Sequence, residues 1–379
     1  MELAILRHFG VLAGLLTMIA ACQPTESNRR SQSKPPGTIY LTDPETIGID
    51  TTLLDQAKSY AFKPERETQS VLILKGEQVI AEWYAEGKGK DSLVTTWSVA
   101  KSIMSALIGI AVERQEITSI DDSLATYLPG QPQEFEAITI RHMLEMTSGR
   151  QWQESSQAEI MATQSPDQLK YSQELGIAHE PGTVWSYSSA DSMLLSSIFP
   201  EATGMELGDY AQKHLFQPLG INAEWWTDSK NQTLGYCCVD TTSWDLAKIG
   251  LIFAQNGQDE GRQIVPASWV EESTRPLDLY SAYGLHWWMN GSIEPSDEDP
   301  RDRHIPGLPT SMFYAVGFHG QFLYVFPDED IIVVRNGTYQ RLFEEAKANP
   351  GVGILTKPPA SWDHASFLAP IFEAVAAAE

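Results

Sequence analysis

Apolar residues recur along this chain with the spacing of strands near both ends and the spacing of helices in between. Residues 70–84 form two apolar runs around a Lys75-Gly76-Glu77 turn, which predicts a β-hairpin. Residues 283–336 return to strand spacing, and we expect strands at 284–289, 312–316, 321–326 and 331–335. Helical spacing predicts helices at 52–62, 98–115, 192–199 and 370–378. Between 115 and about 254, helical patterns and Gly/Pro punctuation dominate.

This order of elements indicates the fold class. Strands, a long helical block and strands again predict an α+β fold: one antiparallel sheet built from both chain ends, with an inserted mostly helical lobe. A ligand site between two such lobes is expected on geometric grounds. Residues 290–309 form a long polar loop within the strand region. We expect it to decorate the surface, the alternative being that it borders the site.

The first residues of the chain have a pattern typical of targeting. The apolar run 9–21 follows Arg7 and His8 and is too short to span a bilayer, so it fits the apolar region of a secretory signal. It ends in Ile19-Ala20-Ala21-Cys22, which resembles a bacterial lipobox whose cysteine receives lipid. The alternative is an ordinary signal peptide that carries a cysteine. We assign 1–21 to a lipoprotein signal peptide, 22–40 to a flexible tether and 41–379 to one globular domain.

That assignment predicts a bacterial cell-envelope protein that contacts the membrane through a lipid anchor only. Gln23 follows Cys22, and the lack of an aspartate there favours the outer membrane or the periplasmic side. The oligomeric state is left open by the sequence.

Composition narrows the function classes. The 379 residues are 42% hydrophobic and 20% charged, as in globular proteins, with a formal net charge of −24. This acidity argues against nucleic acid as a partner, because a phosphate backbone would be repelled. Three cysteines cannot make a disulfide scaffold. Cys237 and Cys238 are adjacent, so a bond between them would close a strained eight-membered ring, and we expect buried thiols.

The sequence also lacks the patterns that are typical of metal sites and phosphate-binding sites. The eight histidines show no metal-ligand spacing, and no Gly-rich phosphate cradle is present. The sequence therefore predicts neither a metal nor a cofactor. His142, on a predicted helix after Thr139, is expected to be structural, and so is most of the aromatic material of the Trp225-Trp226 and Trp287-Trp288 pairs.

The first candidate for chemistry is the pair Ser98 and Lys101. A Ser-x-x-Lys spacing is weak by itself, since Ser31 and Lys34 repeat it in the tether. Ser98, however, follows Trp97 and opens an apolar helix. There the unpaired N–H groups favour an oxyanion beside the serine, and a lysine three residues on lies on the same helical face. The alternative is a helix cap with a snorkelling lysine.

Two more segments carry candidate residues. In 181–189 a Pro-Gly turn leads into an aromatic stretch containing Tyr187, which beside a lysine could relay the serine proton. The alternative is a partly buried loop tyrosine. In 317–321, the sequence Gly-Phe-His-Gly-Gln, glycine would let a ligand approach the strand edge closely.

Together these segments resemble the serine β-lactamase and penicillin-binding-protein superfamily over about residues 45–375. The closest resemblance is to class C β-lactamases, family VIII carboxylesterases and 6-aminohexanoate-dimer hydrolases. Other stretches match in order: 120–124, 127–129, 138–144, 146–149, 215–220, 235–238 and 244–250. The resemblance implies a β-lactamase-like fold and a serine hydrolase.

The resemblance also implies roles for single residues. Ser98 would be the acylated nucleophile, Lys101 would assist its deprotonation, and Tyr187 would shuttle protons. Ser189 stands where the family's Tyr-x-Asn element has asparagine. It keeps a hydrogen bond but loses the amide that contacts a β-lactam side-chain carbonyl.

The family's Lys-Thr-Gly element has no lysine here. Aligned on Gly320, the residues Phe318 and His319 replace Lys-Thr, and the oxyanion hole would be the backbone N–H groups of Ser98 and Gln321. That lysine helps β-lactamases and cell-wall peptidases to bind a substrate carboxylate. Its loss and the acidic chain favour an uncharged ester or amide as the small-molecule substrate.

The walls of the pocket are assigned from neighbours of the motifs. Trp97 and Trp185 are expected to line the acyl pocket with Ser189 and Gly320, and His319 to polarise the substrate. The alternative activity is that of a class C-type β-lactamase or a D-alanyl-D-alanine peptidase. A second alternative is a non-catalytic envelope protein that binds ligands.

Overall fold

One sheet organises the part of the chain that the computed structural model describes, residues 35, 37–290, 305–338 and 362–378. Its seven strands have the order β1-β3-β2-β12-β11-β10-β9. Only β1 and β3 run parallel; the other neighbours are antiparallel. The strands are β1 (Tyr40–Leu41), β2 (Thr68–Lys75), β3 (Gln78–Tyr84), β9 (Trp288–Met289), β10 (Phe313–Gly317), β11 (Gln321–Phe326) and β12 (Ile331–Gly337).

The sheet joins both chain ends, as predicted. Strand β2 pairs with β12 from Lys75 opposite Ile331 to Val71 opposite Arg335. The predicted hairpin is confirmed: β2 and β3 flank a turn in which Gly76 has a φ of 56°. Glycine adopts that left-handed conformation without the steric cost of a Cβ.

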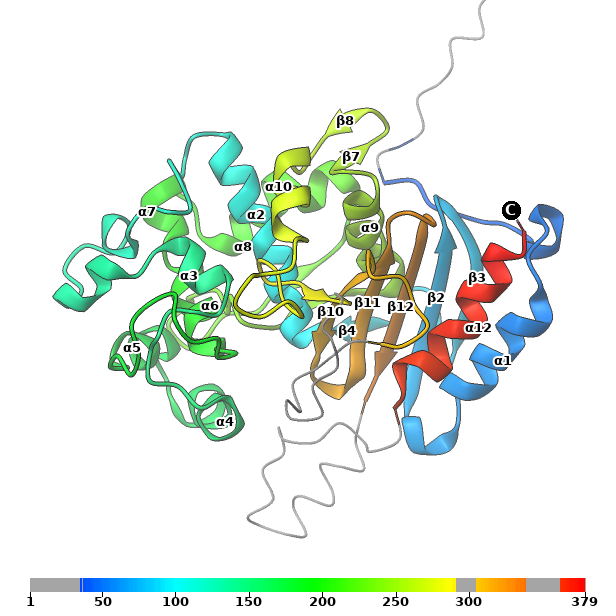
Figure 1. Cartoon of the computed structure of the whole chain (residues 1–379), viewed down its shortest axis with the longest axis horizontal. Coiled ribbons are helices and arrows are strands. Elements are labelled where there is room, and N and C mark those ends of the chain that lie inside the picture. Colours follow the sequence, from blue (N-terminus) through cyan, green and yellow to red (C-terminus); the bar gives the residue numbers. More distant parts are fainter. Residues whose placement is uncertain (1–34, 36, 291–304, 339–361, 379) are drawn as a thin grey trace, which may run out of the picture. The chain divides into compact units, whose positions relative to one another are not determined.

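Helices cover both faces of the sheet, which explains why β11 and β12 are buried along their whole length. On one face, α1 (Thr51–Ala61) and α12 (His364–Ala376) lie side by side (Figure 1). They pack on Val71, Ile73 and Val333. On the other face, α9 (Ser243–Ala254) packs across β2, β11 and β12.

The remaining helices belong mostly to the inserted block. They are α2 (Ala100–Glu113), α3 (Ile140–Leu144), α4 (Glu154–Gln164), α5 (Gln168–Gln173), α6 (Ser189–Ser196), α7 (Phe199–Thr203), α8 (Leu207–Ala211) and α10 (Ala267–Ser273). Shorter strands form a three-stranded sheet, β4 (Leu93–Thr95), β6 (Val239–Thr242) and β5 (Glu224–Trp225), and the hairpin of β7 (Gln258–Asp259) with β8 (Arg262–Gln263). Single helical turns are Pro44–Ile47, Pro64–Arg66, Trp97–Val99, Leu124–Thr126, Gln133–Ala137, Gln212–Phe216, Gln217–Leu219 and Phe318–Gly320.

Several predicted boundaries differ from the structure for identifiable reasons. The strand expected at 284–289 is reduced to Trp288–Met289, because His286 has a φ of 62° and turns the chain away from extended geometry. The last helix begins at His364, not at 370, and contains Pro370 in its interior. Helix α6 begins at Ser189, where Ser188 caps it by accepting from the N–H of Asp191.

The expectation of buried thiols at 237 and 238 is wrong: Cys237 and Cys238 are joined by a disulfide. The left-handed backbone of Cys238, with a φ of 76°, is part of the turn in which these adjacent residues are bonded. Both residues are buried, as expected.

Two sequence predictions fall largely outside the described residues. They are the signal peptide with Cys22 and most of the tether. Of the loop at 290–309, only Asn290 and 305–309 are described. Asn290 is fully buried, and its side chain bridges the backbone of Ile305, Leu308 and Pro309. Within the described part of the chain, no helix has the length and apolar character needed to cross a bilayer.

Candidate active site

Ser98 is delivered to the site by the end of a short strand. Strand β4 is pinned to β6, after which Trp97–Val99 forms a 3₁₀ turn that runs directly into α2. Trp97 has a left-handed backbone, with a φ of 50°, a conformation that costs a non-glycine residue free energy and recurs at functional sites. Its carbonyl accepts from the N–H of Cys238 at 3.3 Å.

Lys101 lies one turn further on, on a helix that is buried for most of its length. The lysine is 1% exposed, and its Nζ contacts three oxygen atoms. Nζ lies 3.0 Å from Ser98 Oγ, 3.3 Å from Ser189 Oγ and 2.8 Å from the carbonyl oxygen of Tyr236, all within hydrogen-bond distance. The pair predicted from sequence is therefore in hydrogen-bond contact, and Ser189 joins it.

Tyr187 reaches the same place from the segment before α6. Lys101 Nζ lies 4.8 Å from the centre of the Tyr187 ring. The ring stacks on Trp288 at 5.7 Å, with an angle of 17° between the planes. Backbone contact of Ser186 with Met146 at 2.8 Å holds this segment against the end of α3.

Trp185 belongs to an aromatic cluster rather than standing alone. Its ring lies 4.2 Å from that of Tyr280 and also contacts Tyr283 and Trp288. Since Trp288 stacks on Tyr187, this aromatic cluster packs against the Tyr187 ring and holds it in place. The expectation that Trp287 and Trp288 serve packing agrees with their burial, 0% and 7% exposed, although Trp288 also borders Tyr187.

The segment 317–321 meets the serine segment at a glycine. A Cβ on Gly317 would lie 2.3 Å from the carbonyl oxygen of Thr96 and 3.2 Å from Cβ of Trp97. No side chain fits there, because the backbone of the serine segment fills the space beside Gly317. The approach of a ligand to this strand edge stays a prediction. Phe318 follows at once, its ring 5.3 Å from that of Trp97.

Gln321 and His319 are both largely buried in this segment. The Gln321 side chain is 3% exposed and donates to the carbonyl of Gly337 at 2.7 Å, which ties β11 to β12. His319 is 8% exposed, and its ring packs 5.6 Å from that of Trp97. Burial lowers the pKa of His319 to about 4, so the ring is neutral at pH 7.

Sequence reasoning missed Glu154, the first residue of α4. Its carboxylate accepts from Ser189 Oγ at 2.6 Å and from the Ser189 N–H at 2.9 Å. It also accepts from the indole N–H of Trp152 at 2.6 Å. The only available signal was an acidic residue in the first turn of a helix after the 146–149 stretch, which is too common to single out.

A buried histidine beside the lysine was also missed. His286 is 2% exposed, with Nε2 3.4 Å from Ser192 Oγ, and its carbonyl accepts from Ser102 Oγ at 2.7 Å. Burial, and after it the charge of Lys101, lowers the pKa of His286 to about 3. The His286 ring is therefore neutral at pH 7.

An ion pair secures the helix that carries Ser189. Arg150 and Asp191 are buried and lie 3.3 Å apart, and Asp191 also accepts from Ser148 Oγ at 2.6 Å. Burial raises the pKa of Asp191, while Arg150 opposes that shift. His142 is structural, as predicted, because it forms a reciprocal capping box with Thr139 at the start of α3.

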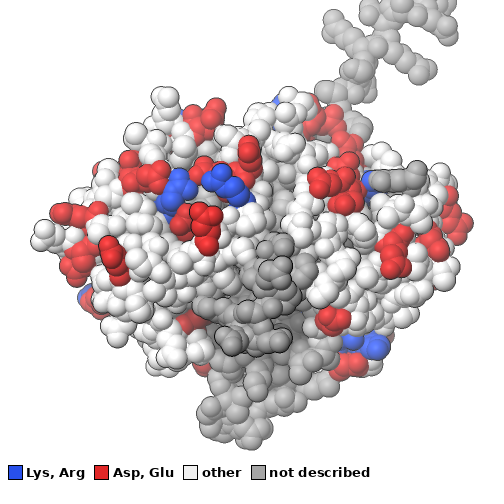
Figure 2. All heavy atoms as spheres, in the orientation of Figure 1, with Lys and Arg blue, Asp and Glu red and all other residues white. Residues whose placement is uncertain are grey.

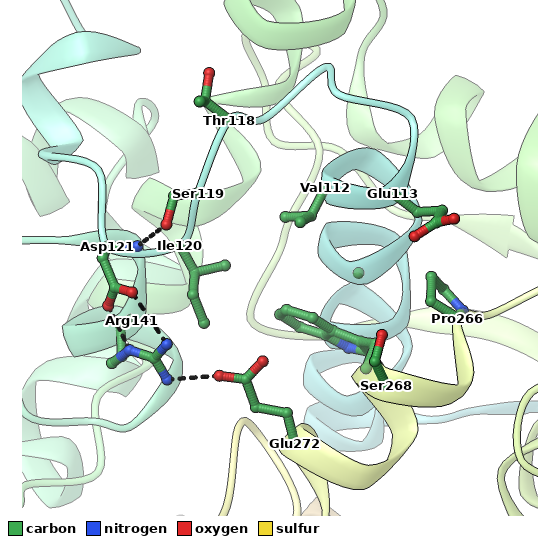
Figure 3. A pocket seen from close by; sticks show the side chains of 12 residues that line it. Val112, Glu113, Thr118, Ser119, Ile120, Asp121, Arg141, Pro266, Ser268 and Glu272 are labelled. Atoms are coloured by element: carbon green, nitrogen blue, oxygen red, sulfur yellow. Dashed lines mark hydrogen bonds and ion pairs between the residues drawn. The ribbon is translucent and has the colours of Figure 1, made fainter.

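A separate hollow lies between the end of α2 and α10, and Figure 3 shows its lining. Arg141 is the cation of this pocket, and it is held by Asp121 at 2.5 Å and Glu272 at 2.9 Å. Its charge is matched by carboxylates, so the hollow has no free cation for an anionic ligand. Among the described residues, no group of three or more His, Cys, Asp or Glu side chains could hold a metal ion.

The fold and the serine-lysine arrangement define a class of protein, and comparison with protein families gives the same class. Residues 62–351 match the family described as Beta-lactamase. The chain therefore belongs to the beta-lactamase family. The predicted α+β, β-lactamase-like fold and the superfamily resemblance are confirmed.

Among particular proteins, the chain is 22% identical over 342 residues to a 6-aminohexanoate-dimer hydrolase of Paenarthrobacter ureafaciens, covering 81% of this chain and 83% of that one. A solved structure from Bacillus anthracis carries the name 6-aminohexanoate-dimer hydrolase. It superposes with a TM-score of 0.68 at 18% identity, and the match covers 90% of this chain and 88% of that one. The structure of EstCE1, a hydrolase with promiscuous acyltransferase activity, superposes with a TM-score of 0.61 at 15% identity, over 76% and 93%. These names support the prediction of a hydrolase.

Proposed function

We propose that the protein is a serine hydrolase that cleaves an ester or amide bond through an acyl-serine intermediate. The observation that carries the proposal is the contact of 3.0 Å between Lys101 Nζ and Ser98 Oγ at the start of a buried helix. The tyrosine ring 4.8 Å from the same nitrogen completes the catalytic group of Ser98, Lys101 and Tyr187.

In this mechanism Lys101 and Tyr187 carry the protons in both acylation and deacylation. Lys101 in its free-amine form takes the proton of Ser98 Oγ as that oxygen bonds to the substrate carbonyl carbon. The carbonyl oxygen takes the negative charge. When the tetrahedral intermediate collapses, the leaving alcohol or amine receives a proton from the lysine ammonium through Tyr187. Water then adds to the acyl-serine, the same groups accept and return its proton, and the acid and free serine are released.

Backbone N–H groups would stabilise the oxyanion, each by about 3–4 kcal/mol. One donor is Ser98, at the helix start. Alignment on Gly320 gives Gln321 as the second donor. Gly317 packs on Thr96, so the segment 317–321 lies against the serine segment, as this assignment requires.

The proposed substrate is uncharged around the scissile bond. No lysine precedes the glycines of 317–321 to receive a carboxylate, and the chain has a net charge of −24. Trp97, Trp185 and Ser189 would form pocket walls, with neutral His319 able to donate a hydrogen bond. The D-alanyl peptidase and β-lactamase activities depend on an anionic substrate and are the less favoured alternatives.

We also propose, from the sequence alone, that Cys22 carries a lipid that anchors the enzyme in a bacterial envelope. Expression of the full chain in a Gram-negative host, followed by labelling with a palmitate analogue, tests this. Wild type should be labelled and sediment with membranes, and Cys22→Ser should do neither. Equal labelling of both proteins contradicts the anchor.

The test of the catalytic proposal is covalent labelling by a fluorophosphonate, with turnover of p-nitrophenyl butyrate measured on the same samples. Wild type should label with one equivalent and turn over the ester. Ser98→Ala should do neither, while the matched variant Ser31→Ala, in the second Ser-x-x-Lys match, should behave as wild type. A Ser98→Ala protein that labels as well as wild type would refute the assignment.

Nitrocefin measured beside the ester separates the alternatives. A preference for nitrocefin favours a β-lactamase. Failure of the wild type to label or to turn over any substrate in a panel of esters, amides and β-lactams favours a protein that only binds its ligands.

A further inference from the structure

The carboxylate of Glu154 lies directly behind the serine that contacts the lysine. It belongs to α4, whereas Ser189 begins α6 and Lys101 lies on α2, so three helices meet here. Glu154 Oε1 accepts from Ser189 Oγ at 2.6 Å, and Oε2 accepts from the Ser189 N–H at 2.9 Å. A carboxylate at the N-terminus of α6 is favoured by the helix dipole.

The carboxylate is occupied on both oxygens by groups of the protein. Besides Ser189, the indole N–H of Trp152 donates to Oε2 at 2.6 Å. Trp152 is 9% exposed and packs in a core cluster with Cys237 and Cys238. Because all three contacts are internal, Glu154 is built into the scaffold and is not aimed at a substrate.

These contacts fix the direction of the hydrogen bonds around the lysine. A hydroxyl such as that of Ser189 can donate or accept. Its single hydrogen is directed to Glu154, so toward Lys101 Nζ, at 3.3 Å, Ser189 Oγ can only accept. The carbonyl of Tyr236, 2.8 Å from the same nitrogen, can also only accept.

A free-amine lysine has two N–H donors and one lone pair. With both donors directed to Ser189 and Tyr236, the lone pair is left facing the third neighbour, Ser98 Oγ, at 3.0 Å. That is the geometry in which the amine takes the serine proton. Without Glu154, the Ser189 hydroxyl could donate its own hydrogen to the lysine and compete with Ser98.

We propose that Glu154 is a positioning residue of the hydrolase: it holds the Ser189 hydroxyl as a hydrogen-bond acceptor and thereby aims the Lys101 lone pair at Ser98. The inference rests on the proposed function and deepens it. It also accounts for serine at a position where the resembling family has asparagine. An asparagine carbonyl is always an acceptor, whereas serine needs a partner to make it one.

The experiment measures kcat and KM for p-nitrophenyl butyrate in Glu154→Gln, Ser189→Ala and the double variant, with kcat normalised to fluorophosphonate-titrated active sites. Glu159→Gln is the matched control, since it makes the same change on α4 without a side-chain contact to Ser189. Misplacement of a catalytic group costs up to about 100-fold in rate. We expect Glu154→Gln to lower kcat by about 10- to 100-fold. Its KM should stay within about twofold, because the substrate-binding surface is unchanged.

Coupling between the two sites is the decisive readout. If Glu154 acts through Ser189, the double variant should be no slower than Ser189→Ala alone. Ser189→Ala also provides a second measurement, since it removes the hydroxyl and leaves Glu154 in place. A purely structural role of Glu154 would reduce the fraction of titratable sites instead of the rate per site.

The possible outcomes separate the two proposals. If wild type is active and Glu154→Gln keeps its kcat per site, or changes KM alone, the positioning role is wrong. The same holds if the two substitutions multiply in the double variant. If wild type neither labels nor turns over an ester, the proposed function fails first and the positioning role falls with it.

Discussion

At the scale of single residues, the most consequential group outside the proposed catalytic residues is His286. It is 2% exposed, and burial beside Lys101 lowers its pKa to about 3 from an ordinary value of 6.5. A group whose pKa is lower in the folded state binds its proton more readily in the unfolded state. It therefore contributes stability that is present above about pH 6.5 and is lost as the pH falls from there toward 3.

This pH dependence can be tested with His286→Asn. Asparagine tolerates the φ of 62° at this position, so the backbone need not change. Between about pH 7.5 and 5.5 the wild type should lose about 1 kcal/mol more unfolding free energy than the variant. His319 is present in both proteins and its pKa is also lowered, so both should lose some unfolding free energy over this pH range. Urea denaturation at the two pH values measures the difference, and parallel losses in the two proteins would contradict the role of His286.

Gly317 is the second residue whose substitution has a predicted effect, on both stability and labelling. Its φ of −122° is open to any amino acid, so the constraint is the space beside Thr96 and not the backbone. Gly317→Ala should cost about 1–3 kcal/mol of stability. Because the clash displaces the strand from the serine segment, the fluorophosphonate labelling rate should fall at least about tenfold. Gly89→Ala, where an added Cβ meets nothing within 4 Å, is the control. Wild-type labelling by the Gly317 variant would show that this contact does not shape the site.

At the scale of elements, helix α2 is held in place by a glycine as well as by its apolar face. A Cβ on Gly109 would lie 2.2 Å from the indole of Trp269, which is 4% exposed on α10. The two helices therefore pack through a tryptophan that lies directly on a helix backbone. This packing fixes the far end of the helix whose first turn carries Lys101.

Gly109→Ala tests that packing against helix propensity. Alanine is favoured over glycine in a helix by about 1 kcal/mol. The clash with Trp269 should outweigh this, and we expect a net loss of about 1–2 kcal/mol in chemical denaturation. Gly208→Ala on α8, where the nearest atom would be at an ordinary 3.6 Å, should be neutral or stabilising. Equal effects of the two substitutions would mean that Trp269 moves aside without cost.

At the scale of the whole molecule, charge is the dominant property. The chain carries 50 acidic against 26 basic residues, and Figure 2 shows carboxylate side chains over the visible face. A field of this sign repels anions approaching any site, and salt screens it over about 10 Å at 0.1 M.

The expected consequence is a salt effect that depends on the substrate. For an anionic ester such as mono-p-nitrophenyl succinate, kcat/KM should rise several-fold between about 20 mM and 500 mM NaCl. For the neutral butyrate ester it should change by less than about twofold. Initial rates at low substrate concentration give both values. An anionic ester that is preferred at low salt would contradict the proposed substrate class.

Much of this protein was determined by local sequence. The strands 321–326 and 331–335, the hairpin around Gly76 and the α+β class follow from apolar spacing, which the structure retains because each face of the sheet is buried. Ser98 and Lys101 could be paired from their spacing together with the apolar helix that Ser98 opens, since positions three apart share a face of one helix. The ordered motif resemblance added the superfamily, which the family match confirms.

Tertiary structure decided what lies around that pair. Glu154, Tyr236 and His286 come from segments distant in sequence, and they reach Lys101 or its neighbours only because helices and loops meet there. The bond between Cys237 and Cys238 and the left-handed His286 were likewise invisible to periodicity, which reports burial and not backbone turns. Sequence set the elements and the spacing of Ser98 and Lys101 because those depend on neighbours along the chain. The partners of the lysine depend on neighbours in space, which only the folded chain provides.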